Sequence, residues 1–103
     1  MDRVARIQEF LKASPADSFL LHALALEYVK TGNETGARSI FESVLLRDPG
    51  YTGSYYHLGK LLERTREKQA AIDWYAKGMA AAKTAGDQHA LGELRAAYED
   101  LVD

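Results

Sequence analysis

The chain has 103 residues, of which 47% are apolar and 27% are charged, a balance typical of one globular domain and unlike that of a disordered chain. Fifteen acidic residues against thirteen basic ones give a net charge of −2, so no broad basic surface is available to neutralise nucleic-acid phosphates. The absence of cysteine excludes disulfides, thiolate metal sites and cysteine nucleophiles.

The composition indicates a chain that is almost entirely helical. It contains two prolines, Pro15 and Pro49, and is rich in alanine, the residue with the highest helix propensity. Apolar residues recur at helical spacing between the turn signals. We expect an all-α fold with six helices, near residues 2–13, 16–30, 34–47, 52–64, 68–84 and 87–102.

The first two helices are separated by the sequence Ser14-Pro15-Ala16-Asp17. Pro15 is expected at the first position of the second helix, because proline lacks the N–H that this position leaves unbonded. The second helix then has an apolar face that follows the helical repeat. That face consists of Leu21, Leu24, Ala25 and Tyr28.

Turn residues separate the remaining helices. Gly32 is expected in the left-handed conformation at the end of the second helix, and Asn33 is expected to cap the third. Asp48-Pro49-Gly50 ends the third helix. The charged residues 63–69 form the turn between the fourth and fifth helices, and Asp87 is expected to cap the sixth.

The helical pattern repeats with a period of about 34 residues. Pro15 and Pro49 are separated by this distance, and so are several sets of chemically similar residues. Each period holds two helices, and each end of the chain carries half of the pattern. The matched sets are Ile7, Phe41 and Tyr75; Leu11, Leu45 and Met79; Leu24 and Leu58; Ala25 and Gly59; and Ala37 and Ala71.

These residues resemble the tetratricopeptide repeat, a unit of about 34 residues with an aromatic residue, Leu-Gly, Tyr, Ala, Phe and Pro at set offsets. The first full copy holds Leu21, Leu24, Ala25, Tyr28, Ala37, Phe41 and Pro49 at these positions, and the second holds Tyr55, Leu58, Gly59, Leu62, Ala71 and Tyr75. The resemblance implies an α-solenoid of antiparallel helix hairpins in a single domain. It divides the chain into a half-repeat over 2–16, repeats over 17–50 and 51–85, and a terminal helix over 86–103.

Three positions depart from the family pattern. Arg66 stands where the first copy has the turn glycine Gly32, and Lys83 stands where it has Pro49. These two changes bear on the turns of the second copy and not on the repeat itself. Arg95 replaces the small residue of the final half-copy, which suits a terminal helix with a polar outer face.

The resemblance implies a non-catalytic module that binds a protein or peptide partner. Tetratricopeptide arrays usually bind peptides in a concave groove lined by the exposed flank of each first helix. Some relatives clamp a terminal carboxylate with lysine, asparagine and arginine, but here those positions hold His22, Leu26, His57, His89 and Glu93, so the clamp is absent. The predicted groove residues are Phe19, His22, Leu26, Lys30, Tyr56, Lys60 and Glu63.

Several alternatives stay open for these residues. Phe19 and Leu26 could instead pack beneath the first helix. Trp74 is either a partner anchor or, as the pattern favours, a packing residue against the neighbouring hairpin. The charge run 63–68 is either a docking site or a solvated turn, and its mixed sign favours the turn. The open ends of a short array also favour a second function, self-association into homo-oligomers.

No motif for catalysis or cofactor binding is found. A glycine-rich phosphate loop, a zinc-protease motif and a nucleophile elbow are all absent, so we expect no enzyme activity, no catalytic residue and no cofactor. His22, His57 and His89 recur at nearly the repeat length, either as a metal-binding or pH-sensing row or as three solvated imidazoles. No carboxylate accompanies them at ligand spacing, which favours the second interpretation and predicts no metal site.

The chain shows no sign of a membrane or secreted location. The longest apolar stretch, residues 19–26, is too short to cross a bilayer. The residues that follow Met1 include no apolar signal-peptide core. We therefore expect a cytoplasmic chain with no membrane partner.

Overall fold

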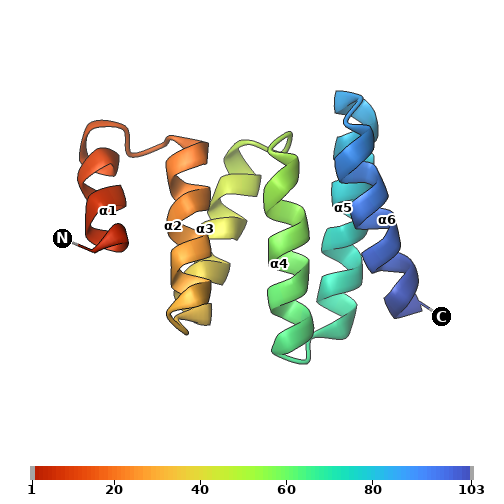
Figure 1. Ribbon diagram of the computed structural model, residues 1–103. Helices are drawn as coiled ribbons and strands as arrows, with labels where there is room; N and C mark the ends of the chain where they lie inside the picture. Colours follow the sequence, from red (N-terminus) through yellow and green to blue (C-terminus); the bar gives the residue numbers. More distant parts are fainter. Residues whose placement is uncertain (1, 103) are drawn as a thin grey trace. The chain divides into compact units, whose positions relative to one another are not determined.

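The computed structural model describes residues 2–102, and these residues are helical apart from the turns between helices (Figure 1). The all-α class is confirmed, and the ends of the helices lie within two residues of the predicted ones. The described residues form two compact units, one up to Asp48 and the other from Pro49 onward. The helices are α1 (Arg3–Ala13), α2 (Ser18–Lys30), α3 (Glu34–Arg47), α4 (Thr52–Arg64), α5 (Lys68–Ala85) and α6 (Gln88–Val102).

In the first unit, α1 and α3 both pack on α2. Two polar contacts join α1 to α2: Arg3 Nε lies 2.7 Å from Glu27 Oε1, and Gln8 Nε2 donates to the Tyr28 hydroxyl at 3.4 Å. The apolar face predicted for α2 supplies Leu24 and Ala25 to the core. The buried apolar residues of this unit are Ile7, Leu24, Ala25, Ala37, Phe41, Val44 and Leu45.

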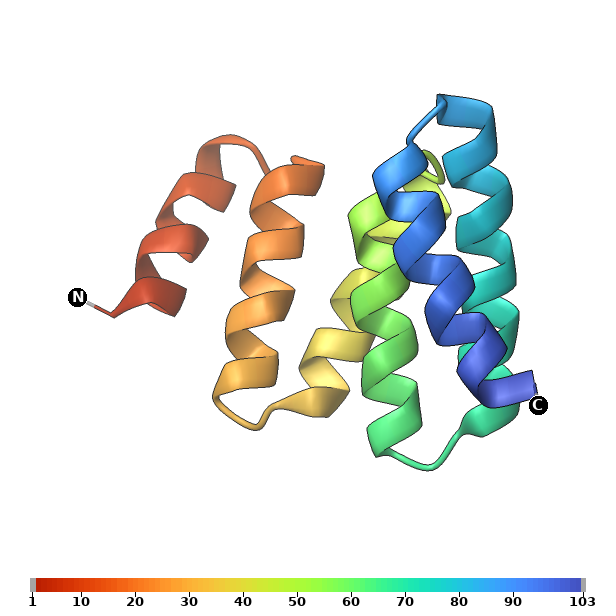
Figure 2. The ribbon, with the colours of Figure 1, turned by 45° about the vertical axis from the view of Figure 1, so that its right-hand side comes forward.

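In the second unit, α4, α5 and α6 all pack on one another (Figure 2). α4 and α5 approach each other closely at Gly59, where an added Cβ would lie 2.1 Å from Cε1 of Tyr75. Gly78 of α5 likewise lies close against α4, because a Cβ there would lie 2.7 Å from Cβ of Tyr55. The buried apolar residues are Tyr55, Leu58, Leu61, Leu62, Ala71, Tyr75, Ala82, Ala90, Leu91, Leu94 and Ala97.

The start of α2 differs from the prediction. The helix begins at Ser18, and Pro15 lies in the turn before it rather than at the first helical position. The reason is that Asp17 is the capping residue, since its carboxylate accepts a hydrogen bond from the Leu20 N–H at 3.0 Å. Ser14 ends α1 instead, donating its N–H to the carbonyl of Phe10 at 3.2 Å.

The other two predicted caps are confirmed. Asn33 Oδ1 accepts from the Gly36 N–H at 3.0 Å, and Asp87 Oδ1 accepts from the Ala90 N–H at 3.0 Å. The Thr52 hydroxyl also donates to Asp87 Oδ2 at 3.1 Å, which ties the start of α6 to the start of α4. These donors favour the ionised carboxylate, so they hold the pKa of Asp87 below its ordinary value.

Three turns end their helices in the same way. Gly32, Arg66 and Gly86 each adopt a left-handed conformation, with φ of 87°, 63° and 70°. In each turn the next residue donates its N–H to the carbonyl five residues earlier, at 2.8 to 2.9 Å. The turn of the second copy therefore keeps the shape of the first, although an arginine replaces the glycine. Lys83, by contrast, changes the structure: without a proline, α5 continues to Ala85.

Arg66 adopts the left-handed conformation although it carries a side chain. A left-handed conformation costs a residue with a side chain about 1 kcal/mol relative to glycine. We therefore expect Arg66→Gly to raise the free energy of unfolding by about 0.5–1 kcal/mol, measured by urea denaturation. The reverse change at the equivalent turn, Gly32→Arg, should lower it by a similar amount. Equal destabilisation by both variants would contradict the assignment of these turns.

Candidate partner-binding surface

The predicted groove residues of the first unit lie on α2. Phe19 is 68% exposed, so it does not pack beneath α1. His22 is half-buried, and its ring lies edge-on to Phe41 with the ring centroids 5.7 Å apart. Leu26 is also half-buried, one turn further along the helix. Lys30 is exposed at the helix end, with Nζ 3.6 Å from Glu27 Oε1. This unit thus presents an aromatic and an aliphatic side chain with a lysine at the end.

The predicted groove residues of the second unit form a connected row on α4. The Lys60 ammonium lies 5.6 Å from the centroid of the Tyr56 ring, a cation–π contact. The same nitrogen is 3.6 Å from Glu63 Oε2. The side chains of Lys60 and Glu63 are 39% and 28% exposed, so both remain accessible to a partner. The structure therefore brings Tyr56, Lys60 and Glu63 together, as one aromatic ring beside one ion pair.

A residue that the sequence did not single out as part of the site completes this row. The hydroxyl of Tyr75, on α5, donates to Glu63 Oε2 at 2.5 Å, and its ring lies 6.5 Å from that of Tyr56. Burial raises the pKa of Tyr75, and the hydrogen bond to the Glu63 carboxylate raises it further. Tyr75 is therefore a stable hydrogen-bond donor. The sequence does carry a signal for this contact. Tyr75 and Glu63 are both polar, whereas the equivalent residues of the first copy, Phe41 and Val29, are both apolar.

The three histidines have different environments. His22 packs on Phe41, whereas His89 is exposed with Nε2 3.8 Å from Glu93 Oε1. Burial lowers the pKa of His57, Glu93 partly opposes this effect, and Arg64 adds to it. Within residues 2–102, no three histidine or carboxylate side chains come together as a group able to hold a metal ion.

Trp74 packs within its own hairpin. The centroid of its ring lies 6.1 Å from that of Tyr55 on α4, and the Lys77 ammonium lies 4.6 Å from the tryptophan ring. The residue is half-buried. This contact fits the interpretation of Trp74 as a packing residue. Trp74 packs on Tyr55 of its own α4–α5 hairpin, however, and not on the neighbouring hairpin.

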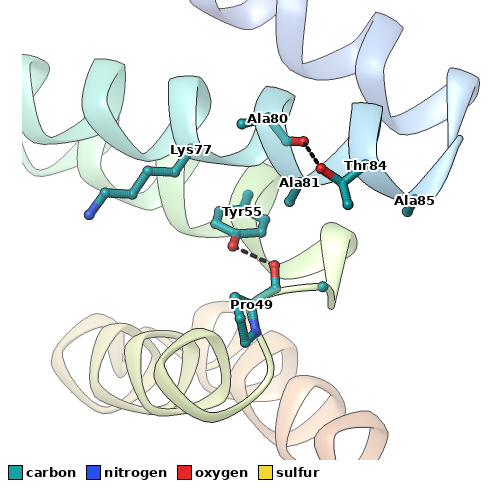
Figure 3. Close-up of a pocket in the computed structure, with 8 residues that line it drawn as sticks. Pro49, Tyr55, Lys77, Ala80, Ala81, Thr84 and Ala85 are labelled. Atoms are coloured by element: carbon teal, nitrogen blue, oxygen red, sulfur yellow. Dashed lines mark hydrogen bonds between the residues drawn. The ribbon is translucent and has the colours of Figure 1, made fainter.

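A cavity of about 400 Å³ opens between Tyr55 and the second half of α5 in the second unit (Figure 3). Two hydroxyls in its lining are already hydrogen-bonded: the Tyr55 hydroxyl donates to the Pro49 carbonyl at 2.5 Å, and the Thr84 hydroxyl donates to the Ala80 carbonyl at 3.1 Å. None of the predicted groove residues lines it. Small side chains on the second half of α5 leave this space. The lining consists of Pro49, Gly50, Tyr55, Lys77, Ala80, Ala81, Thr84 and Ala85.

Comparison with known proteins identifies the family. A sequence model described as tetratricopeptide repeat matches residues 52–84. A crystal structure of a tetratricopeptide repeat domain protein from Salinibacter ruber is 44% identical, covers 82% of this chain and 94% of its own, and superposes with a TM-score of 0.79. The chain belongs to the tetratricopeptide repeat family. A comparison with curated proteins finds no significant match.

Other solved structures extend the fold match. A solution structure of a Bordetella parapertussis protein is 25% identical, covers 98% of this chain and 88% of its own, and has a TM-score of 0.83. The Sgt2 tetratricopeptide domain from Aspergillus fumigatus is 22% identical, covers 94% and 64%, and has a TM-score of 0.77, a likeness of fold alone. The predicted α-solenoid class is confirmed by these neighbours.

The family sets the general role of the chain. Tetratricopeptide repeats are protein–protein interaction modules that bind protein partners, and they are generally non-catalytic. In the part of the chain that the structure describes, none of the helices is both long and apolar enough to span a membrane.

Proposed function

We propose that this tetratricopeptide repeat protein binds an extended segment of a protein partner through the exposed face of α4 in the second unit, and that the exposed face of α2 in the first unit is a second contact surface. The observation that carries the proposal is the accessible, connected row of Tyr56, Lys60 and Glu63 on α4. On α2, Phe19, His22, Leu26 and Lys30 form a second, more apolar patch. The division into a half-repeat, two repeats and a terminal helix within a single domain is part of the same proposal.

These side chains offer a partner both apolar and polar contacts. Phe19 is a large apolar side chain left 68% exposed, so a partner that covers it removes apolar surface from water. Tyr56 supplies an amphipathic ring of the kind enriched at interface hot spots. Lys60 and Glu63 add polar groups that can fix the orientation of the bound partner segment. Such a combination favours an extended segment with at least one apolar side chain and nearby polar groups.

The experiment is a selection of random heptapeptides, displayed on phage, against the intact chain. Dissociation constants of the selected peptides are then measured by fluorescence anisotropy for the wild type and its variants. We expect Phe19→Ala and Tyr56→Ala to weaken binding about tenfold or more. Phe10→Ala is the matched control, because Phe10 is 64% exposed on α1, outside the proposed surface. Equal loss in Phe10→Ala, or no loss in the other two, would exclude this surface.

Self-association is the second candidate function. Phe10 on α1 and Val102 on α6 are large apolar residues with 64% and 46% exposure, each on a terminal helix. A second copy of the chain could cover them. Light scattering after size exclusion would then give a mass above 11.4 kDa that falls on dilution and in Phe10→Ala. A mass that stays at 11.4 kDa over the concentration series would rule this function out.

A further inference from the structure

Tyr75 connects the core of the second unit to the proposed binding surface. Its side chain is fully buried, yet its hydroxyl donates to Glu63 Oε2 at 2.5 Å, and Glu63 is 28% exposed on α4. The ring passes over Gly59, where any Cβ would lie 2.1 Å from it. The absence of a side chain at position 59 is therefore what lets the phenol reach that carboxylate.

The preceding repeat provides an internal comparison. At the positions about 34 residues earlier, the ring is Phe41, without a hydroxyl, and Val29 stands in place of the carboxylate. Leu26 stands in place of Lys60. At these three positions the second repeat thus has polar groups where the first repeat has apolar side chains. A purely structural role for Tyr75 needs only the ring, as Phe41 shows by being fully buried in the first repeat.

The hydrogen bond and the ion pair of Glu63 both use Oε2 and leave Oε1 for a partner. Tyr75 and Lys60 both approach Oε2, at 2.5 and 3.6 Å. Among the residues that the structure describes, none donates a hydrogen bond to Oε1. The carboxylate is thus held at one oxygen and offers the other at the surface. Lys60, held between Glu63 and the Tyr56 ring, has further N–H donors on its ammonium group.

We infer that Tyr75 is a positioning residue whose hydroxyl fixes Glu63, so that Glu63 and Lys60 together bind a side-chain carboxamide of the partner. An anionic group would be repelled by Glu63, and a cationic one by Lys60. A neutral carboxamide of Asn or Gln donates to Oε1 and accepts from Nζ at once. This inference rests on the proposed function, because it names the group that the α4 row recognises.

The positioning role is tested without any ligand. Three-bond NMR couplings report whether the Glu63 side chain occupies one rotamer or averages among several. We expect one rotamer in the wild type and averaging in Tyr75→Phe, which keeps the buried ring. Tyr55→Phe is the matched control, because Tyr55 is a buried tyrosine whose hydroxyl bonds the Pro49 carbonyl at the same 2.5 Å. A fixed Glu63 in Tyr75→Phe would overturn the inference.

The carboxamide specificity is tested with the selected heptapeptides. We expect Asn or Gln to be enriched at one position, and its replacement by Glu, Lys or Leu to weaken binding about tenfold. Tyr75→Phe should reduce this preference, whereas Tyr55→Phe should keep it. Peptides that depend on Phe19 and Tyr56 but show no carboxamide preference would overturn the inference alone. Peptides that depend on neither residue would overturn the proposed function, while the Glu63 rotamer still reports on positioning.

Discussion

Replacing Gly59 by alanine is expected to lower the free energy of unfolding by about 1–3 kcal/mol. The added Cβ would lie 2.1 Å from Cε1 of Tyr75, far inside van der Waals contact. Tyr75 has little freedom to move away, because its ring is fully buried and its hydroxyl is bonded to Glu63. The clash therefore outweighs the helix propensity of about 1 kcal/mol that alanine gains over glycine. Urea denaturation followed by circular dichroism measures the change.

Gly92→Ala is the matched control for this substitution. Gly92 is also a helical glycine, on α6, but nothing lies within 4 Å of a Cβ built there. The same substitution should therefore raise the free energy of unfolding by about 0.5–1 kcal/mol. A shift of the same sign and size at both glycines would mean that α4 and α5 do not approach closely at Gly59.

Replacing Phe41 by alanine is expected to be the most destabilising single change in the first unit. Phe41 is fully buried, and removing its ring loses the transfer free energy and leaves a cavity, at a cost of about 3–5 kcal/mol. The His22 ring, 5.7 Å from that of Phe41, would also lose its aromatic neighbour. The free energy of unfolding from urea denaturation gives the loss directly.

Phe19→Ala separates this packing effect from a binding effect. Phe19 is 68% exposed, so its loss should change the free energy of unfolding by no more than about 0.5 kcal/mol. Its effect is expected on partner affinity instead. If Phe19→Ala destabilised the chain as much as Phe41→Ala, Phe19 would be a core residue and not a surface one.

Much of the fold followed from local patterns in the sequence. Apolar residues at helical spacing located the helices. Gly32 marked a turn correctly because it adopts the left-handed conformation, and Asn33 and Asp87 marked helix starts correctly because their side chains accept hydrogen bonds from backbone N–H groups. The start of α2 was predicted wrongly because Pro15 and Asp17 are both residue types typical of the start of a helix. The carboxylate of Asp17 bonds the Leu20 N–H directly, and Pro15 falls into the turn.

The parts of the site that involve two helices were harder to predict. Spacing along α4 placed Tyr56, Lys60 and Glu63 on one flank, because that depends on one helix alone. The bond from Tyr75 to Glu63 depends on how closely α5 approaches α4 at Gly59, which no single-helix pattern records. The cavity lined by Tyr55 and the second half of α5 was missed for the same reason, because it depends on side chains of α4, α5 and the turn before α4.

The most direct test of the proposed surface is NMR chemical-shift mapping of a selected heptapeptide on the intact chain. We expect the amide signals of His22, Tyr56 and Lys60 to shift on titration, together with those of their neighbours on α2 and α4. Shifts confined to α3 and α5, with those three signals unchanged, would contradict the proposed surface.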